Sequence, residues 1–314
     1  MIRAIALRFL AAIPVLVGIS VISFVIVRLV PGDVVDSILG VEYSDPALEA
    51  EMRRYFGLDK PLHAQFVDWF AALLRGDLGF SYRTGRPVLD EILTRFPATA
   101  ELAISALVVS VIIAIPFGVL SATRRNGVLD SVTRFVSLLG LSVPNFWLGI
   151  LMISLFSVQL RWFPSGGSVP FSFSWDYFQY LVLPATALGT SLAAVTVRMT
   201  RSSMLEVLGQ DYIRTAESKG LRPRTVIGTH GLRNALIPVV TVVGIQAGAL
   251  LGGTVVVEQV FSWPGLGTLV INAIGNRDYA VVQGTVLFLA AFYVAVSLIV
   301  DILYLYLDPR LRRG

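Results

Sequence analysis

Six long runs of the chain contain no Asp, Glu, Lys or Arg, and each is about 19 to 26 residues long. A helix needs about 20 mainly apolar residues to cross the hydrocarbon core of a bilayer. The runs do not alternate between apolar and polar positions, as membrane β-strands do, so we expect helices. The six predicted spans are Phe9–Val27, Leu102–Thr123, Phe135–Leu160, Tyr177–Val197, Asn234–Val257 and Tyr279–Val300.

The composition supports a protein that is embedded in a membrane. Hydrophobic residues make up 55% of the 314 residues and charged residues 15%, whereas soluble domains carry about 25% charged residues. The first run is too long for a cleaved signal peptide and is read as a retained span. We therefore predict an all-α integral membrane protein with six transmembrane helices.

Cysteine and histidine usage excludes several kinds of site. The chain has no cysteine and two histidines, His63 and His230, which are far apart in the sequence. Thiolate, disulfide and histidine-rich metal chemistry is therefore not expected. The net charge of +4 fits membrane orientation signals better than nucleic-acid binding, because no basic run is interleaved with aromatic residues.

Basic residues gather in the short connections on one side of the predicted membrane. The short connections on the opposite side contain only Arg161 and Arg277, and the seven basic residues of the long segment 31–97 on that side count for little in this rule. Because Lys and Arg in short loops mark the cytoplasmic side, both termini are predicted to be cytoplasmic. The basic residues on the predicted cytoplasmic side are Arg3, Arg8, Arg124, Arg125, Arg134, Arg198, Arg201, Arg214, Lys219, Arg222, Arg224, Arg233, Arg310, Arg312 and Arg313.

The same pattern divides the chain into segments. We expect an N-terminal segment with the first span (1–30), an extracytoplasmic segment (31–97), a permease core of five helices (98–307) and a short cytoplasmic tail (308–314). Within the extracytoplasmic segment, His63–Leu74 carries an apolar stripe at helical spacing and predicts an amphipathic helix.

Proline occurs inside the predicted spans, at Pro14, Pro116, Pro144, Pro184 and Pro238. Proline removes a backbone hydrogen bond and kinks a helix, which can open a cavity between helices. Membrane helices also tolerate proline generally, so both readings stay open.

Two similar pentapeptides, 96–100 and 183–187, are predicted to begin spans. They suit either an internal repeat or ordinary proline placement near a helix start.

The connection 198–233 is predicted to be cytoplasmic and to contain a short helix. Tyr212, Thr215, Ala216 and Lys219 fall on one helical face, and Gly220 is placed to end the helix as a left-handed cap. A face of small residues suits docking into a groove of another protein. A solvated connector is the alternative that periodicity alone leaves open.

This connection resembles the EAA loop of ATP-binding-cassette importer permeases, through Arg214-Thr215-Ala216 and Gly220. The following H-x-L-R-N-A-L-I-P form, His230–Pro238, is similar to the dipeptide, oligopeptide and nickel branch. Where the usual pattern has I-x-L-P, this chain keeps Leu232 but has His230 and Arg233 in place of Ile and Pro. Further matching motifs lie at 28–33, 57–61, 75–79, 252–258, 261–267 and 307–310.

The resemblance covers essentially the whole chain and implies a type I importer fold. It implies a second permease subunit, two ATP-binding subunits that dock on the cytoplasmic loops, and an extracytoplasmic solute-binding protein. The chain has no G-x4-G-K-[ST] phosphate loop. We therefore expect a non-catalytic subunit without a cofactor of its own, with ATP and Mg on the partner subunits.

Polar residues around the fifth span are candidates for the translocation path, because polar groups facing lipid are costly. Hydrogen bonding between helices is the alternative explanation. These candidates are Asn145, Gln246, Glu258, Gln259 and Asn272.

The stretch Glu258–Gly267 carries Phe261 and Trp263, while Pro264 and neighbouring glycines argue against a regular helix. We expect this stretch to pack among the helices at the outer mouth, as an outer gate or as a fixed plug. We expect Glu258 to be held by Arg277 or by backbone N–H groups.

Other functions remain to be weighed against an importer of di- or oligopeptides. Glutathione or chelated nickel are alternative substrates within the same branch. A stand-alone secondary transporter or channel would commonly carry ionisable residues inside its spans. The six runs contain none by definition, and those at their edges, such as Glu258 and Asp301, are few. A membrane-embedded protease would need Ser/His, Asp/Asp or HExxH arrangements, which are not found.

Overall fold

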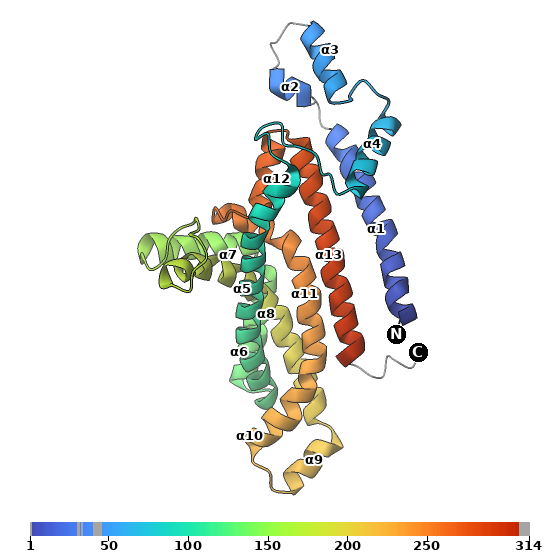
Figure 1. Cartoon of the computed structure of the whole chain (residues 1–314). Helices are drawn as coiled ribbons and strands as arrows, with labels where there is room; N and C mark the ends of the chain where they lie inside the picture. Colours follow the sequence, from blue (N-terminus) through green and yellow to red (C-terminus); the bar gives the residue numbers. More distant parts are fainter. Residues whose placement is uncertain (1, 30–31, 33, 40–45, 308–314) are drawn as a thin grey trace. The chain divides into compact units, whose positions relative to one another are not determined.

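The computed structural model describes residues 2–29, 32, 34–39 and 46–307 and consists of helices and connecting loops (Figure 1). It divides into two compact units. Unit 1 contains Ala98–Pro264 and the described residues from Ala295 onward, and unit 2 contains the described residues up to Pro97 together with Gly265–Val294.

Among the described residues, five helical stretches are long and apolar enough to cross a membrane, and a bent pair of helices supplies a sixth if it counts as one span. The five stretches are Arg8–Leu29, Val88–Thr123, Trp175–Leu208, Pro223–Leu250 and Tyr279–Val300. They belong to α1 (Ile2–Leu29), α5 (Val88–Thr123), α8 (Trp175–Leu208), α11 (Arg233–Val260) with the turns before it, and α13 (Tyr279–Leu307).

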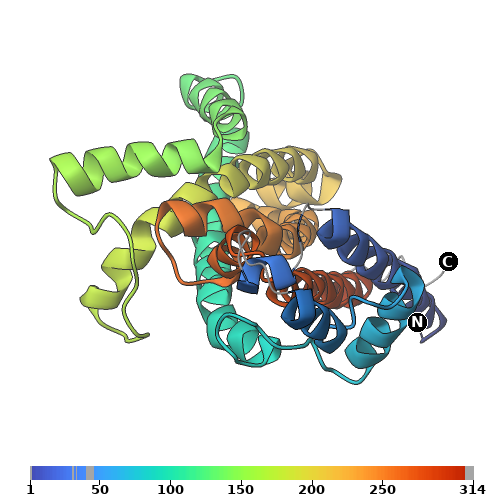
Figure 2. The same cartoon turned by 90° about the horizontal axis from the view of Figure 1, so that it is seen from above.

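The predicted third span, Phe135–Leu160, is not a single helix. It is built from α6 (Val128–Ser142) and α7 (Asn145–Met152), with a π-helical continuation over Ile153–Gln159, and the two halves are bent by 102° (Figure 2). Val143 is extended, with ψ 122°, because the ring of Pro144 disfavours a helical residue before it. The kink suggested by Pro144 is therefore a complete break.

In unit 1, α8 is the central helix. It packs against α6, α7 and α11, and α8 and α11 lie side by side in Figure 1. Close approach is possible where α8 carries a small residue, since a Cβ added at Gly189 would lie 2.7 Å from the carbonyl oxygen of Ala106 in α5. Small residues at helix contacts allow such approach in membrane proteins.

Several helices extend beyond their predicted limits. Helix α5 begins at Val88, not near Leu102, so both predicted pentapeptides lie inside helices. Helix α8 continues to Leu208, and α10 (Pro223–Thr225) with a π-helical segment (Val226–Leu232) leads into α11. The connection predicted as 198–233 is thus mostly helical. Polar residues such as Arg, Lys and Glu form helices about as readily as Leu or Met, so a helix can continue beyond the apolar run.

In unit 2, the short helices α2 (Val34–Leu39), α3 (Pro46–Tyr55) and α4 (Leu62–Leu74) follow the first span. The amphipathic helix predicted at His63–Leu74 is confirmed as α4. Its Phe66 packs edge-on against Phe24 of α1, with ring centroids 5.2 Å apart.

Helix α12 (Leu266–Gly275) was not predicted and packs its Leu266, Leu269 and Ala273 against Val88 and Ile92 of α5. The break predicted at Glu258–Gly267 is shorter than expected, because α11 ends at Val260 and α12 begins at Leu266. The motif residues Val30, Pro31 and Asp33, and the segment 308–314 with its basic residues, lie outside the described residues.

Candidate coupling and translocation sites

Helix α9 (Asp211–Ser218) has a buried side and an exposed side. Ile213 and Ala216 pack with Val226 in a small apolar cluster. Tyr212 is 44% exposed, and its hydroxyl accepts a hydrogen bond from the Asn234 amide at 3.2 Å. The cluster holds α9 against the segment that leads into α11 and leaves one face of the helix free to meet a partner.

Ala216 differs from the other three residues predicted to share a docking face. Tyr212, Thr215 and Lys219 are exposed, whereas Ala216 is 7% exposed and contacts its own chain. The hydrophobic cluster of Ile213 and Val226 draws it inward. Replacing Ala216 with a larger residue would therefore disturb the packing of α9 itself, as well as any docking contact.

Gly220 adopts the left-handed conformation that the sequence suggested, with φ +76°. Its N–H donates to the carbonyl oxygen of Glu217 at 2.8 Å. A Cβ at this position would meet no atom within 4 Å. The requirement for glycine is therefore one of backbone conformation and not of space.

Asn145 and Gln246 line one cavity of about 600 Å³ in unit 1, formed with residues of α6, α8 and α11. The Gln246 amide joins two helices at the wall of this cavity. Its Nε2 donates to the carbonyl oxygen of Leu192 at 3.2 Å, and its Oε1 accepts from the Thr196 hydroxyl at 3.1 Å. Gln246 thus links α11 to α8 and also borders a space that can hold solute.

Glu258 is completely buried, and its Oε1 accepts a hydrogen bond from the Thr99 hydroxyl at 2.8 Å. The predicted donor, Arg277, belongs to unit 2 and lies against Gly32, where an added Cβ would be 2.5 Å from Nη1. Glu258 is therefore a link between α11 and α5 and does not border the cavity of Asn145 and Gln246.

The remaining two path candidates lie elsewhere. Gln259 is exposed, and Asn272 is an exposed residue of α12 in unit 2. Asn272 lines a separate polar cavity of about 310 Å³ that also includes Arg83 and Glu91. The structure therefore brings together two of the five predicted path residues.

The predicted outer gate contains two buried aromatic residues and one exposed proline. Phe261 is 2% exposed and Trp263 is 1% exposed, and both belong to the main apolar cluster of unit 1. The Trp263 Nε1 donates to the carbonyl oxygen of Ala98 at 2.8 Å. Pro264 is exposed. The expected packing of the aromatic residues among the helices is thus present, and we call this buried pair the plug, a name that does not imply whether it moves.

A loop that the sequence did not single out completes this plug. The Gly167 N–H donates to the Phe261 carbonyl oxygen at 2.8 Å, and a Cβ at Gly166 would lie 2.5 Å from that oxygen. The Gly166–Gly167 pair was the available signal, since paired glycines mark places where backbones meet closely. Thr99 was also missed, although it lies in the first of the two pentapeptides.

A buried ion pair lies at the other end of α5. Asp130 of α6 is completely buried, and the Arg201 guanidinium of α8 binds both of its carboxylate oxygens. The Ser121 hydroxyl and the Asn126 N–H donate to the same carboxylate at 2.5 and 3.0 Å. The pair fixes three helices beside the start of the connection to α9, and hydrophobic patterning gave no sign of it.

No group of three or more His, Cys, Asp or Glu side chains in the described part of the chain is placed to hold a metal ion. The chemistry that these sites offer is hydrogen bonding, ion pairing and apolar packing.

Comparison with protein families gives two matches that together span the chain. Residues 114–313 match the family described as binding-protein-dependent transport system inner membrane component. Residues 1–103 match the N-terminal region described for membrane components of such systems.

Curated relatives match over nearly their full lengths. The di/tripeptide transport system permease protein DppB of Pseudomonas aeruginosa is 43% identical over 99% of each chain. The oligopeptide transport system permease protein AppB of Bacillus subtilis is 42% identical over 97% of each chain. The glutathione transport system permease protein GsiC of Escherichia coli is also 42% identical over 97% of each chain.

A solved structure of the MetNI methionine ABC transporter, in inward-facing conformations, is similar with a TM-score of 0.57. The match is 17% identical and covers 69% of this chain and 96% of that chain. At this identity the likeness concerns the fold, which is that of an importer permease.

Proposed function

Because the chain belongs to the family of binding-protein-dependent transport system inner membrane components, we propose that it conducts di- or oligopeptides through the membrane for an ATP-driven importer. Membership in this family makes the chain a permease subunit of a transport system. The similarity to the di/tripeptide and oligopeptide permeases over nearly the full length supports the choice of substrate.

The observation that carries this proposal is the free face of α9. Tyr212, Thr215 and Lys219 are exposed on a helix whose other side is fixed by Ile213 and Ala216. A rigid helix with one exposed face can enter a groove of an ATP-binding subunit and transmit its movement to α11. Gly220 allows the chain to turn away from the docked helix.

The assembly that we infer contains this chain, a second permease subunit, two ATP-binding subunits with ATP and Mg, and an extracytoplasmic solute-binding protein. The asymmetry of Lys and Arg supports a cytoplasmic location for both termini and for α9. This orientation places α9 on the side where ATP is available.

Within unit 1, the cavity of Asn145 and Gln246 is the part of the path that we assign to this chain. The plug of Phe261 and Trp263 is the proposed outer gate, with exposed Pro264 at its edge. Glu258 supports the helix before the plug through Thr99. Gln259 of unit 1 and Asn272 of unit 2 are exposed polar residues, and each is proposed to face solute within its own unit.

The test is uptake by proteoliposomes that contain the complex co-expressed with its neighbouring subunits. We expect ATP-dependent uptake of a labelled dipeptide and co-purification of an ATP-binding subunit. Thr215→Arg should lower both, because a long charged side chain obstructs the docking face, whereas Glu206→Arg, on α8, serves as the control.

Glutathione is the second candidate substrate, since GsiC is as similar as the oligopeptide permease. Uptake assays with glutathione and with chelated nickel form parallel arms. Uptake of one of these without uptake of peptides would contradict the proposed substrate. Uptake by this chain alone, without an ATP-binding subunit, would indicate a secondary transporter.

A further inference from the structure

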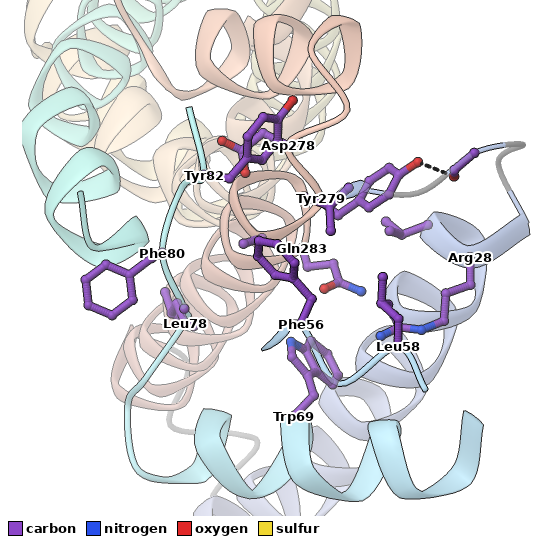
Figure 3. Close-up of a pocket in the computed structure, with 15 residues that line it drawn as sticks. Arg28, Phe56, Leu58, Trp69, Leu78, Phe80, Tyr82, Asp278, Tyr279 and Gln283 are labelled. Carbon is purple, nitrogen blue, oxygen red and sulfur yellow. Dashed lines mark hydrogen bonds between the residues drawn. The ribbon is translucent and has the colours of Figure 1, made fainter. Parts of the chain in front are cut away.

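A cavity of about 260 Å³ lies in unit 2, where α1 ends and α13 begins (Figure 3). Apolar side chains make up much of its wall, including Val27 of α1 and Trp69 of α4. Since one water occupies about 30 Å³ in the liquid, a single ordered water cannot fill this space. The cavity is large enough for a segment of a larger amphipathic molecule.

The amide of Gln283 reaches this cavity from α13 (Figure 3). Gln283 is 5% exposed, and its Nε2 has no hydrogen-bond partner. A buried N–H donor without an acceptor destabilises the folded state. This donor therefore indicates that the cavity accommodates a molecule with an oxygen acceptor.

Arg28 supplies positive charge at another part of the wall. Its guanidinium carbon lies 3.5 Å from the ring centroid of Phe24, and its Nε donates to Gln65 at 3.2 Å. These contacts hold the cation in place without neutralising it. Arg28 and Gln283 both present donors, which favours a ligand rich in oxygen acceptors.

The other polar groups of the wall are engaged within the chain. The Tyr279 hydroxyl donates to the Gly32 carbonyl oxygen at 2.8 Å, and the Tyr82 hydroxyl donates to that of Asn276. The Ser81 hydroxyl and the Val281 N–H donate to Asp278. Asp278 lies well apart from Arg28 in Figure 3, so its carboxyl group does not compete for the cation.

The position of the cavity along the membrane spans restricts the ligand. The span in α1 ends at Leu29 and the span in α13 starts at Tyr279, so the cavity lies at the level of one membrane–water boundary. Its walls include Trp69, Tyr82 and Tyr279, residue types that favour this boundary. An acyl chain and a polar headgroup meet at the same level.

We propose that this cavity binds one membrane phospholipid, whose ester carbonyl accepts from Gln283 and whose phosphate binds Arg28. The apolar wall holds the first part of an acyl chain. The site depends on the chain spanning a membrane and does not depend on which solute is transported.

The test is native mass spectrometry of the assembled transport complex after delipidation and addition of phosphatidylglycerol or phosphatidylethanolamine. Gln283→Leu and Arg28→Gln should each weaken binding of one phospholipid about tenfold, the effect of one lost hydrogen bond near a charge. Gln159→Leu and Arg161→Gln, which change exposed residues of the same types, should bind as the wild type does.

Two further arms identify the ligand chemistry. Diacylglycerol, which lacks phosphate, should bind the wild type more weakly than a phospholipid does, and Arg28→Gln should not change its binding. Inorganic phosphate should not reduce the binding of phospholipid. A phospholipid with a photoreactive acyl chain should crosslink to Trp69 or Leu78 in the wild type. This arm does not depend on a variant folding correctly.

Unchanged phospholipid binding in both Gln283→Leu and Arg28→Gln would overturn the proposal and leave water as the occupant. Crosslinks confined to residues outside the cavity wall would overturn it as well. If inorganic phosphate abolished phospholipid binding, the site would be one for free phosphate and the proposal would be overturned.

Discussion

Arg201 donates two hydrogen bonds to Asp130, from Nε to Oδ1 at 2.7 Å and from Nη2 to Oδ2 at 2.9 Å. This two-point geometry is the strongest common form of ion pair in proteins. It connects α8 with α6, and Ser121 adds α5 to the same carboxylate. The three helices are thus fixed together next to the connection that carries α9.

We expect Asp130→Ala to destabilise the complex by about 3 kcal/mol, the lower part of the range for breaking a buried pair, because the Arg201 side chain remains 20% exposed. Thermal unfolding of the purified complex measures this change. Arg134→Gln is the control, since Arg134 is 56% exposed and lies 3.7 Å from Asp130, and should change stability by less than about 1 kcal/mol. Equal effects of the two variants would contradict the assigned role.

Gly166→Ala should disturb the plug, because its Cβ would lie 2.5 Å from the Phe261 carbonyl oxygen. The backbones must separate, which costs about 1–3 kcal/mol as in other overpacked sites. Gly253→Ala is the control, since no atom lies within 4 Å of the added Cβ. The thermal midpoints of the two variants give the comparison, and a midpoint for Gly166→Ala equal to that of Gly253→Ala would count against the close contact.

Thr99→Val should remove one donor from the buried Glu258 carboxylate and destabilise the complex by about 1.5 kcal/mol or more. The fluorescence of Trp263, which packs in the same unit, can report the midpoint of thermal unfolding. Thr94→Val changes an exposed threonine of the same helix and should have little effect. A neutral result for Thr99→Val would mean that the other contacts of Glu258 are sufficient.

Gly220→Ala should impose about 1–2 kcal/mol of backbone strain, because φ at this residue is +76°. A steric clash is not expected, since no atom lies within 4 Å of the added Cβ. We expect reduced ATP hydrolysis stimulated by the solute-binding protein, with unchanged abundance of the complex. Gly228→Ala adds the same methyl group with no atom within 4 Å and without a positive φ, so it should keep normal hydrolysis. If both variants hydrolyse ATP normally, the turn at Gly220 is not needed for coupling.

Burial raises the pKa of Asp278 above its usual range, and hydrogen bonds from Ser81 and Val281 partly oppose this effect. The raised pKa means that the folded state prefers the protonated acid. Its contribution to stability is therefore complete below the unfolded value of about 3.9 and is lost as the pH rises through the folded pKa.

Asp278→Asn should remove this pH dependence. The thermal midpoint of the wild type, relative to that of the variant, should fall as the pH rises above the unfolded pKa of about 3.9. Asp59→Asn, at an exposed position, provides the control. A constant difference between wild type and Asp278→Asn as the pH rises would contradict the shifted pKa.

Hydrophobic patterning predicted the spans well, because the need for about 20 apolar residues is a property of the bilayer and can be read along the chain. It predicted α4 from its apolar stripe and the left-handed turn from Gly220. It misplaced the start of α5, since Val88–Arg95 is polar enough to resemble a loop but forms helix against α12.

The contacts between distant segments were beyond the reach of the sequence. Thr99 meets Glu258 across 159 positions, and Arg201 meets Asp130 across 71. The residue type alone does not indicate the partner of any of these four side chains. The partner is known only once the helices are packed together. The same reason explains why the five predicted path residues do not form one lining.

The bend at Pro144 has a consequence for how the protein enters the membrane during synthesis. Helix α6 has 15 residues, and at 1.5 Å per residue it reaches about 22 Å, less than the roughly 30 Å of hydrocarbon. The half that follows the bend, Asn145–Gln159, is equally short. Helix α8 packs against both α6 and α7 and leaves the ribosome after them. The nascent halves must therefore be retained beside the insertion machinery until α8 arrives to shield their exposed ends from lipid.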